Sequence, residues 1–167
     1  PGAPNVIFLN FAGENVTNSQ WSATPIPAVA YSTNADFTTY SDGEQLVIKR
    51  VWQRVAEDYA PFNIDVTTER PATLGTRTAM ALITRSTDAN GAANPFSTAG
   101  GVAYVNVFGT SGYATYRPAW IYHDNLSNVE SYIAEAAFAV GPVAVAALVD
   151  QTQAMEILST IWQVWIF

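Results

Sequence analysis

The side chains that most often carry catalysis are scarce in this chain. It has one histidine, His123, and no cysteine, which excludes thiol nucleophiles, disulfides and cysteine-based metal sites. His123 precedes Asp124, and a serine hydrolase built on this pair would use Ser111, in the segment GTSGY, as its nucleophile. Ser111 lacks the GxSxG elbow, however, and no sequence feature brings it to His123. We therefore interpret His123 as a half-buried structural residue.

Metal binding is the second chemistry to consider. A zinc site needs three or four nitrogen, oxygen or sulfur ligands that converge on one point. With a single histidine, only a carboxylate-rich site is left, and such a site suits calcium better. The candidate calcium ligands are Glu14, Asp124 and Asp150. Their spacing matches no calcium-loop motif, so the alternative is that they are ordinary surface carboxylates.

The composition narrows the range of partners. The 167 residues are 49% hydrophobic and 13% charged, with a formal net charge of −7. This acidic balance provides no basic footprint for nucleic acid, and an anionic membrane would repel it. The length and the apolar content predict a single domain over residues 1–167.

The elements that must position any site begin with a strand, a helix and a second strand. The apolar segment 5–11 predicts a central strand, and 13–40 reads as a long loop. Ser41 and Glu44 form a capping box, which starts a helix that runs to about Tyr59 with Val51 and Val55 on its buried face. The alternating segment 63–68 predicts a strand parallel to the first, because a helical crossover connects the two.

The rest of the chain predicts more strands and a late helix. We expect strands over 79–84, 101–108 and 119–122, followed by a helix capped by Asn128 and interrupted at Gly141-Pro142, since proline removes a helical hydrogen bond. These elements favour an α/β or α+β fold with a mixed, mostly parallel sheet, one long early helix and a late helix.

The C-terminal segment 154–167 is unusually apolar. Leaving it in water would forfeit several kcal/mol of burial, so we expect it to be buried in the domain, in a partner or in a membrane. We expect no membrane span, because Glu156 and Gln163 interrupt a segment that is too short.

Three passages carry a resemblance to a known family: 48–71, 82–91 and 99–109, leading into YIAEAA at 132–137. In this order they resemble secreted bacterial zinc metallopeptidases of the metzincin type, over residues 6–137. The resemblance implies an extracellular location, zinc as the cofactor and a metzincin-like catalytic-domain architecture. Residues 138–167 would then form a degenerate or atypical apolar C-terminal part.

The zinc motif of that family is missing here. YIAEAA would run straight into HExxHxxGxxH and a following Asp. Carried over without gaps, the ligand positions are Ala139, Val143 and Val149, the base position is Val140, the Gly falls on Ala146, and the Asp falls on Asp150. Only Asp150 matches, so no zinc ligand and no catalytic base are present, and no cofactor is expected for the chain as written.

The strand predicted over 101–108 is the strongest candidate for binding. In the resembled family the corresponding strand lies at the sheet edge above the metal and pairs antiparallel with the substrate peptide. An edge strand offers free backbone N–H and C=O groups to an extended chain. The candidate peptide-binding residues are Gly101, Val102, Ala103, Tyr104, Val105 and Asn106. The alternative is an ordinary interior strand.

Three hypotheses follow for function. The resemblance implies a secreted endopeptidase, which the residues at the catalytic positions contradict. A non-catalytic module would instead bind peptide on the edge strand or assemble through the apolar tail. Finally, the segment after Ala137, where the resemblance stops, could be truncated or misread from an active metallopeptidase.

Overall fold

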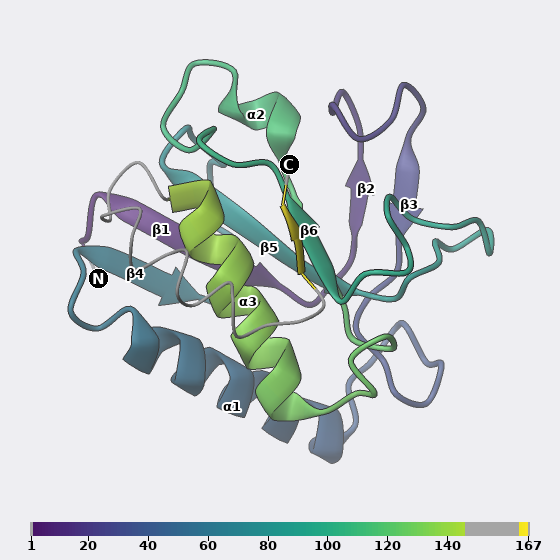
Figure 1. Ribbon diagram of the computed structural model, residues 1–167. Coiled ribbons are helices and arrows are strands. Elements are labelled where there is room, and N and C mark those ends of the chain that lie inside the picture. Colours follow the sequence, from purple (N-terminus) through teal and green to yellow (C-terminus); the bar gives the residue numbers. More distant parts are fainter. Residues whose placement is uncertain (1, 146–163, 167) are drawn as a thin grey trace.

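A six-stranded sheet forms the centre of the molecule. The computed structural model describes residues 2–145 and 164–166. The strands lie in the order β4-β1-β5-β7-β6-β8 (Figure 1). Their bounds are β1 Asn5–Asn10, β4 Ile64–Thr67, β5 Thr78–Thr84, β6 Gly101–Ala103, β7 Ala119–Tyr122 and β8 Val164–Ile166. β4, β1, β5 and β7 run parallel, whereas β6 is antiparallel to β7 and parallel to β8. The predicted α/β class with a mixed, mostly parallel sheet is therefore confirmed.

The early helix α1 (Asp42–Asp58) forms as its cap predicts. The Glu44 N–H donates to the Ser41 Oγ at 3.3 Å, and the Ser41 N–H donates back to the Glu44 Oε2 at 2.8 Å. Val51 and Val55 are fully buried against the sheet. The helix connects β1 to β4, which pair in parallel, as the helical crossover predicted.

The late helix α3 (Glu130–Val145) differs from its prediction at Gly141-Pro142, where it continues without a break. Pro142 has no N–H for the carbonyl of Phe138, four residues earlier. The hydroxyl of Tyr59, at the end of α1, donates to that carbonyl at 3.0 Å. A side chain from another element therefore replaces the hydrogen bond that the proline removes, and the helix can continue.

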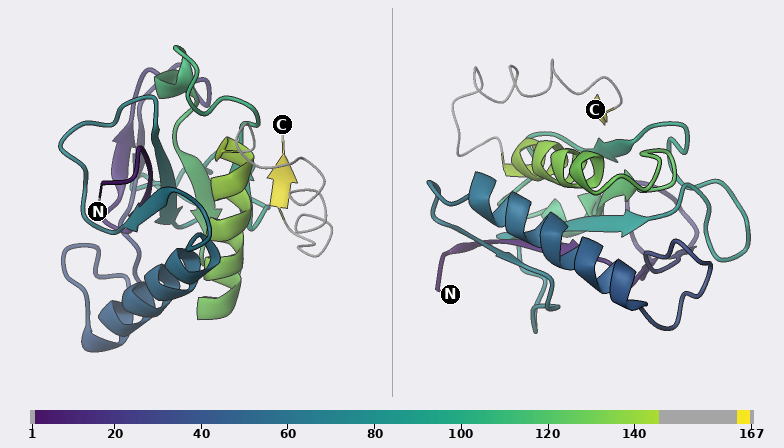
Figure 2. Two further views of the ribbon diagram at one scale, coloured as in Figure 1. Left: turned by 90° about the vertical axis from the view of Figure 1, so that its left-hand side faces the viewer. Right: turned by 90° about the horizontal axis from the view of Figure 1, so that it is seen from below.

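Both helices lie on one face of the sheet, and a small hairpin packs against the other (Figures 1 and 2). The helical side holds the larger core, which includes Ile7, Leu9 and Ile133. On the other side, Trp120 and Tyr122 pack against the antiparallel pair β2 (Glu14–Val16) and β3 (Ile26–Ala28). This hairpin lies inside the segment predicted to be a loop. Pro27 is tolerated there because a two-stranded pair is all edge.

The strand predicted over 101–108 is shorter than expected. β6 ends at Ala103. Asn106 has a φ of 57°, in the left-handed region, so the backbone has left the extended conformation there. The segment 109–118 is largely loop and contains the short helix α2 (Tyr113–Tyr116). Most of the apolar tail, from 154 to 163, lies outside the described residues, and β8 is its described part.

Candidate functional site

The residues at the family's zinc positions do not fit a metal. α3 places Ala139 and Val143 one turn apart on the same face, the spacing at which two histidines could share a zinc ion. Neither residue has a donor atom, however, and Ala139 is buried in the core. Val140, at the base position, cannot accept a proton. Ala146, Val149 and Asp150 lie outside the described residues.

His123 is a core residue, more deeply buried than the sequence predicted, with 1% of its surface exposed. Its Nδ1 lies 2.6 Å from the Asn128 Oδ1, and its ring packs edge-on against Tyr31 at 4.8 Å between centroids. Burial lowers the pKa of His123, which favours the neutral imidazole. Ser111 is exposed in the loop before α2. The described contacts of His123 therefore support a structural role and no serine-hydrolase pair.

The predicted N-cap of α3 is also wrong. Asn128 has a φ of 57°, and its side chain contacts His123 in place of the helix end. The first helical bond runs from the Ile133 N–H to the carbonyl of Val129.

The candidate calcium ligands do not converge in the described structure. Glu14 pairs with Arg70, whereas Asp124 accepts hydrogen bonds from the backbone and the hydroxyl of Ser86, at 2.9 Å and 2.7 Å. Within residues 2–145 and 164–166, no group of three or more histidine, aspartate or glutamate side chains could hold a metal ion. Asp150 falls outside this range.

The candidate peptide-binding residues divide into two groups. Gly101, Val102 and Ala103 form β6, which pairs with β7 on one side and with β8 on the other, in the register Gly101↔Val164, Val102↔Trp165 and Ala103↔Ile166. In this structure β6 is therefore not the outermost strand. Tyr104, Val105 and Asn106 follow the strand and take no part in its ladder.

Tyr104 instead belongs to an aromatic cluster beside the end of β6, which consists of Trp21, Phe96, Tyr104 and Tyr116. The ring of Trp21 lies 4.4 Å from that of Tyr104 and 6.5 Å from that of Phe96, and Tyr104 lies 5.1 Å from Tyr116. The Trp21 indole N–H donates to the carbonyl of Pro118 at 2.9 Å, and the Tyr104 hydroxyl donates to that of Gln20. These bonds fix the rings, while 52% of Phe96 is exposed.

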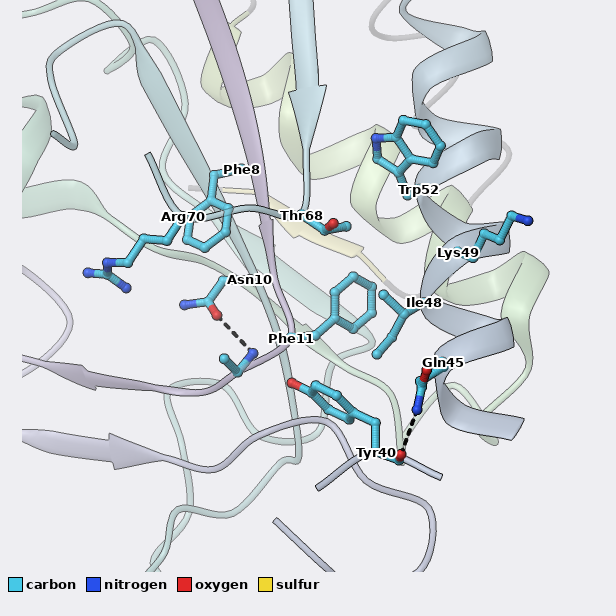
Figure 3. Close-up of a pocket in the computed structure, with 11 residues that line it drawn as sticks. Phe8, Asn10, Phe11, Tyr40, Gln45, Ile48, Lys49, Trp52, Thr68 and Arg70 are labelled. Carbon is cyan, nitrogen blue, oxygen red and sulfur yellow. Dashed lines mark hydrogen bonds between the residues drawn. The ribbon is translucent and has the colours of Figure 1, made fainter. Parts of the chain in front are cut away.

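A pocket of about 470 Å³ lies at the opposite end of the sheet, between the end of β1 and α1 (Figure 3). Its lining comes from three segments: Phe8, Asn10, Phe11 and Ala12 from β1 and its continuation, Tyr40, Gln45, Ile48, Lys49 and Trp52 from α1 and the residue before its cap, and Thr68 and Arg70 after β4. The sequence analysis missed this pocket, because no local motif joins these segments.

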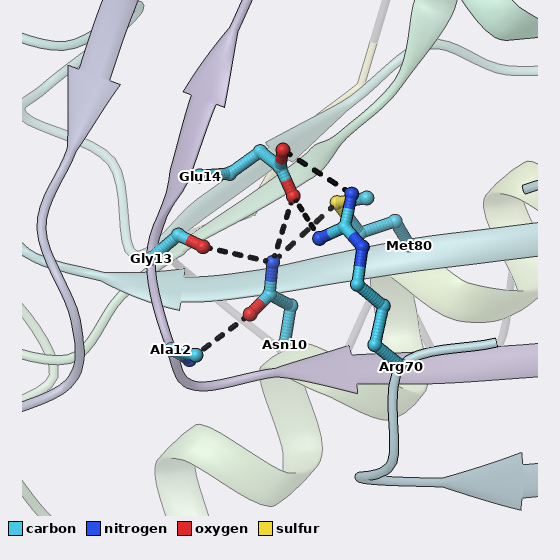
Figure 4. Close-up of polar contacts among 6 residues, drawn as sticks. All are labelled: Asn10, Ala12, Gly13, Glu14, Arg70 and Met80. Carbon is cyan, nitrogen blue, oxygen red and sulfur yellow. Dashed lines mark hydrogen bonds and ion pairs between the residues drawn. The ribbon is translucent and has the colours of Figure 1, made fainter. Parts of the chain in front are cut away.

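A polar cluster fixes one wall of the pocket (Figure 4). The buried Asn10 accepts from the Ala12 N–H at 2.9 Å, and its Nδ2 donates to the Gly13 carbonyl and the Glu14 carboxylate, each at 3.2 Å. Glu14 in turn accepts two hydrogen bonds from Arg70. The cluster connects the end of β1 to the segment that follows β4.

Comparisons of the chain with models of known protein families, with curated proteins and with solved structures found no match. Within residues 2–145 and 164–166, each helix is too short or too polar to traverse a bilayer.

Proposed function

We propose that this protein is a secreted, catalytically inactive domain of metzincin type that holds an extended polypeptide against β6. The observation that carries this proposal is the pairing of β6 with β8. β8 is an extended segment that pairs with the backbone edge of Gly101 to Ala103, the edge that the resemblance implies for the substrate peptide; β8 runs parallel to β6, whereas the resemblance implies an antiparallel peptide. A backbone that accepts one strand can accept another of the same shape, because ladder hydrogen bonds do not depend on side chains.

The position of β6 supports the proposal. Among the strands of residues 2–145, β6 is the outermost on its side of the sheet, and it is antiparallel to its neighbour. α3, which carries the first two of the family's metal positions, packs against β5, β6 and β7. This packing supports the proposal, because the resemblance implies a helix with the metal positions beside the strand that binds the peptide.

The aromatic cluster offers a surface that the side chains of a bound peptide could contact. Successive side chains of an extended peptide point to opposite faces of the sheet. Trp21 packs at 6.5 Å on Trp120, which belongs to the core on the face opposite the helices. A peptide on β6 would present every second side chain toward this face, where the exposed ring of Phe96 favours an apolar residue.

The absence of catalysis in the proposal rests on residue chemistry. Hydrolysis by the family's mechanism needs a zinc-activated water and a carboxylate base. Ala139, Val140 and Val143 provide neither. We therefore propose binding as the function of this fold in the chain as written.

An active peptidase is the second candidate, because α3 keeps the i, i+4 geometry of two zinc ligands at Ala139 and Val143. It requires a natural protein whose sequence differs after Ala137. Intact mass spectrometry of the protein purified from its source decides this point. Agreement between the measured mass and the mass calculated with residues 138–167 as written excludes the second candidate.

Peptide exchange at β6 tests the binding proposal. The probe is a fluorescein-labelled peptide with the sequence of residues 159–167, and the measurement is fluorescence anisotropy with two full-length variants. Trp165→Pro removes a backbone N–H and disfavours β8, whereas the matched control Trp165→Ala keeps the N–H. The proline variant should lose one ladder hydrogen bond between β8 and β6 that the alanine variant keeps, worth about 1.4 kcal/mol. It should therefore bind the probe about tenfold more tightly than the alanine variant. Equal affinity for both variants, or no saturable binding, would refute the exchange.

A further inference from the structure

We infer that the pocket between β1 and α1 binds a small organic acid with an apolar body, such as an aryl-substituted carboxylate. The site is independent of the proposed peptide function. It lies near β4, at one end of the sheet order, whereas β6 lies toward the other end.

The pocket exists because β4 is shorter than β1. β4 pairs with β1 only as far as Phe8, which lies opposite Thr67. β1 continues to Asn10, while the chain after β4 turns away through Thr68 to Arg70. A space therefore opens beside the carboxyl end of β1, a common place for ligands in parallel sheets.

The centre of the pocket is apolar and its walls are fixed. Figure 3 shows Phe11, Ile48 and Tyr40 facing one another, with Trp52 further along α1. Phe11 is buried, whereas 37% of Trp52 is exposed. The Trp52 indole N–H donates to the carbonyl of Val66 at 2.8 Å, which holds the ring in place. An apolar ligand would therefore cover aromatic surface without having to reorganise these side chains.

The charges around the pocket favour an anion. The chain has a net charge of −7, yet the two charged residues that line the pocket are both basic. Arg70 is already neutralised by Glu14. Lys49 is exposed and has no ion-pair partner among the described residues. One unpaired cation beside an apolar cavity matches one carboxylate on an apolar body.

The nearest carboxylate does not oppose this match. Glu44 is close enough to contribute to the raised pKa of Tyr40, after burial. Its carboxylate nevertheless accepts hydrogen bonds from Thr33 and Ser41, and it is not part of the pocket lining. Lys49 is thus the uncompensated cation among the lining residues; Figure 3 shows its side chain directed away from Phe11 and Ile48, so it would turn back over the opening to reach a bound carboxylate.

Calorimetric titration with two probes of nearly equal shape tests the inference. 4-Phenylbutyrate carries the carboxylate, and 4-phenylbutanol is its neutral counterpart. We expect saturable binding of the acid and at least tenfold weaker binding of the alcohol. Lys49→Gln should remove this preference. Arg50→Gln, the same charge change at the next position of α1 and outside the pocket, should keep it.

Two further experiments establish that the acid binds in this pocket and whether the natural ligand is a peptide carboxylate or a free small acid. Ile48→Trp should fill the pocket and abolish binding of the acid, and the acid should shift the NMR signal of the Trp52 indole N–H. A tetrapeptide that ends in phenylalanine, compared with its C-terminal amide, distinguishes a peptide carboxylate from a free small acid as the source. Equal binding of acid and alcohol, retention of the preference in Lys49→Gln, or no binding of either probe would overturn the inference.

Discussion

Replacing Tyr59 with phenylalanine tests how α3 continues through Pro142. The Tyr59 hydroxyl is the described donor to the carbonyl of Phe138, at 3.0 Å, and Tyr59 is 2% exposed. Without the hydroxyl, that carbonyl has neither the tyrosine nor a backbone N–H as its donor. A buried polar group that loses its partner costs about 1–3 kcal/mol. We expect Tyr59→Phe to lower the free energy of unfolding by that amount.

A double-mutant cycle with Pro142→Ala separates this explanation from a general loss of packing. Alanine at this position supplies the backbone N–H that proline lacks, so Tyr59→Phe should cost at least about 1 kcal/mol less in that background than in the wild type. Urea unfolding followed by circular dichroism gives the four free energies. Tyr122→Phe, which removes the hydroxyl that donates to the carbonyl of Pro95, is the control and should show no coupling to Pro142. Additive effects of Tyr59→Phe and Pro142→Ala within about 0.5 kcal/mol would refute the reasoning.

Three more predictions follow from the fold and the candidate site. Val51→Asp places an unpaired carboxylate in the core and should lower the free energy of unfolding by about 4 kcal/mol or more, measured by urea unfolding. Gln53→Asp, on the exposed face of α1, should lower it by less than about 1 kcal/mol. Equal losses for the two variants would refute the packing of α1. Burial opposes ionisation of Glu44, but hydrogen bonds from Thr33 and Ser41 outweigh it and lower its pKa from 4.5 to about 2. Since the folded state then binds the proton less tightly than the unfolded state, Glu44 stabilises the fold above pH 4.5, and this contribution is lost as the pH falls toward 2. The melting temperature of Glu44→Gln should depend less on pH across this window than that of the wild type, and parallel curves would contradict the pKa. Finally, the purified protein should contain no stoichiometric zinc by elemental analysis and should not cleave casein; chelator-sensitive cleavage, with contaminating proteases excluded, would contradict the proposed function.

Local signals allowed much of the fold to be predicted. The capping box of Ser41 and Glu44 fixes the start of α1, and a helical crossover between two strands fixes their parallel order. The continuation of α3 could not be predicted from local signals, because Pro142 depends on Tyr59, a residue 83 positions earlier (142 − 59) on another helix. The end of β6 at Ala103 was missed for a related reason. The segment 102–108 has no glycine or proline, and the change of direction at Asn106 depends on its left-handed backbone.

In the candidate sites, too, local sequence signals predicted some features, whereas contacts between distant residues could not be predicted. The sequence located the β6 residues from a resemblance, but it could not reveal that β8 pairs with them, because ladder partners carry no shared motif. The pocket beside α1 was invisible for a similar reason. Its wall depends on the pairing of Arg70 with Glu14, 56 residues apart, and on the point where β4 stops.

The most direct test of the binding proposal is an NMR titration of ¹⁵N-labelled Trp165→Pro with the peptide of residues 159–167. The amides of Gly101, Val102 and Ala103 form the ladder that the peptide would join. The proposal predicts saturable shifts at these three amides and at the neighbouring Tyr104, with the rest of the sheet unchanged. Saturable shifts centred elsewhere, or a folded protein whose β6 amides do not respond, would contradict it.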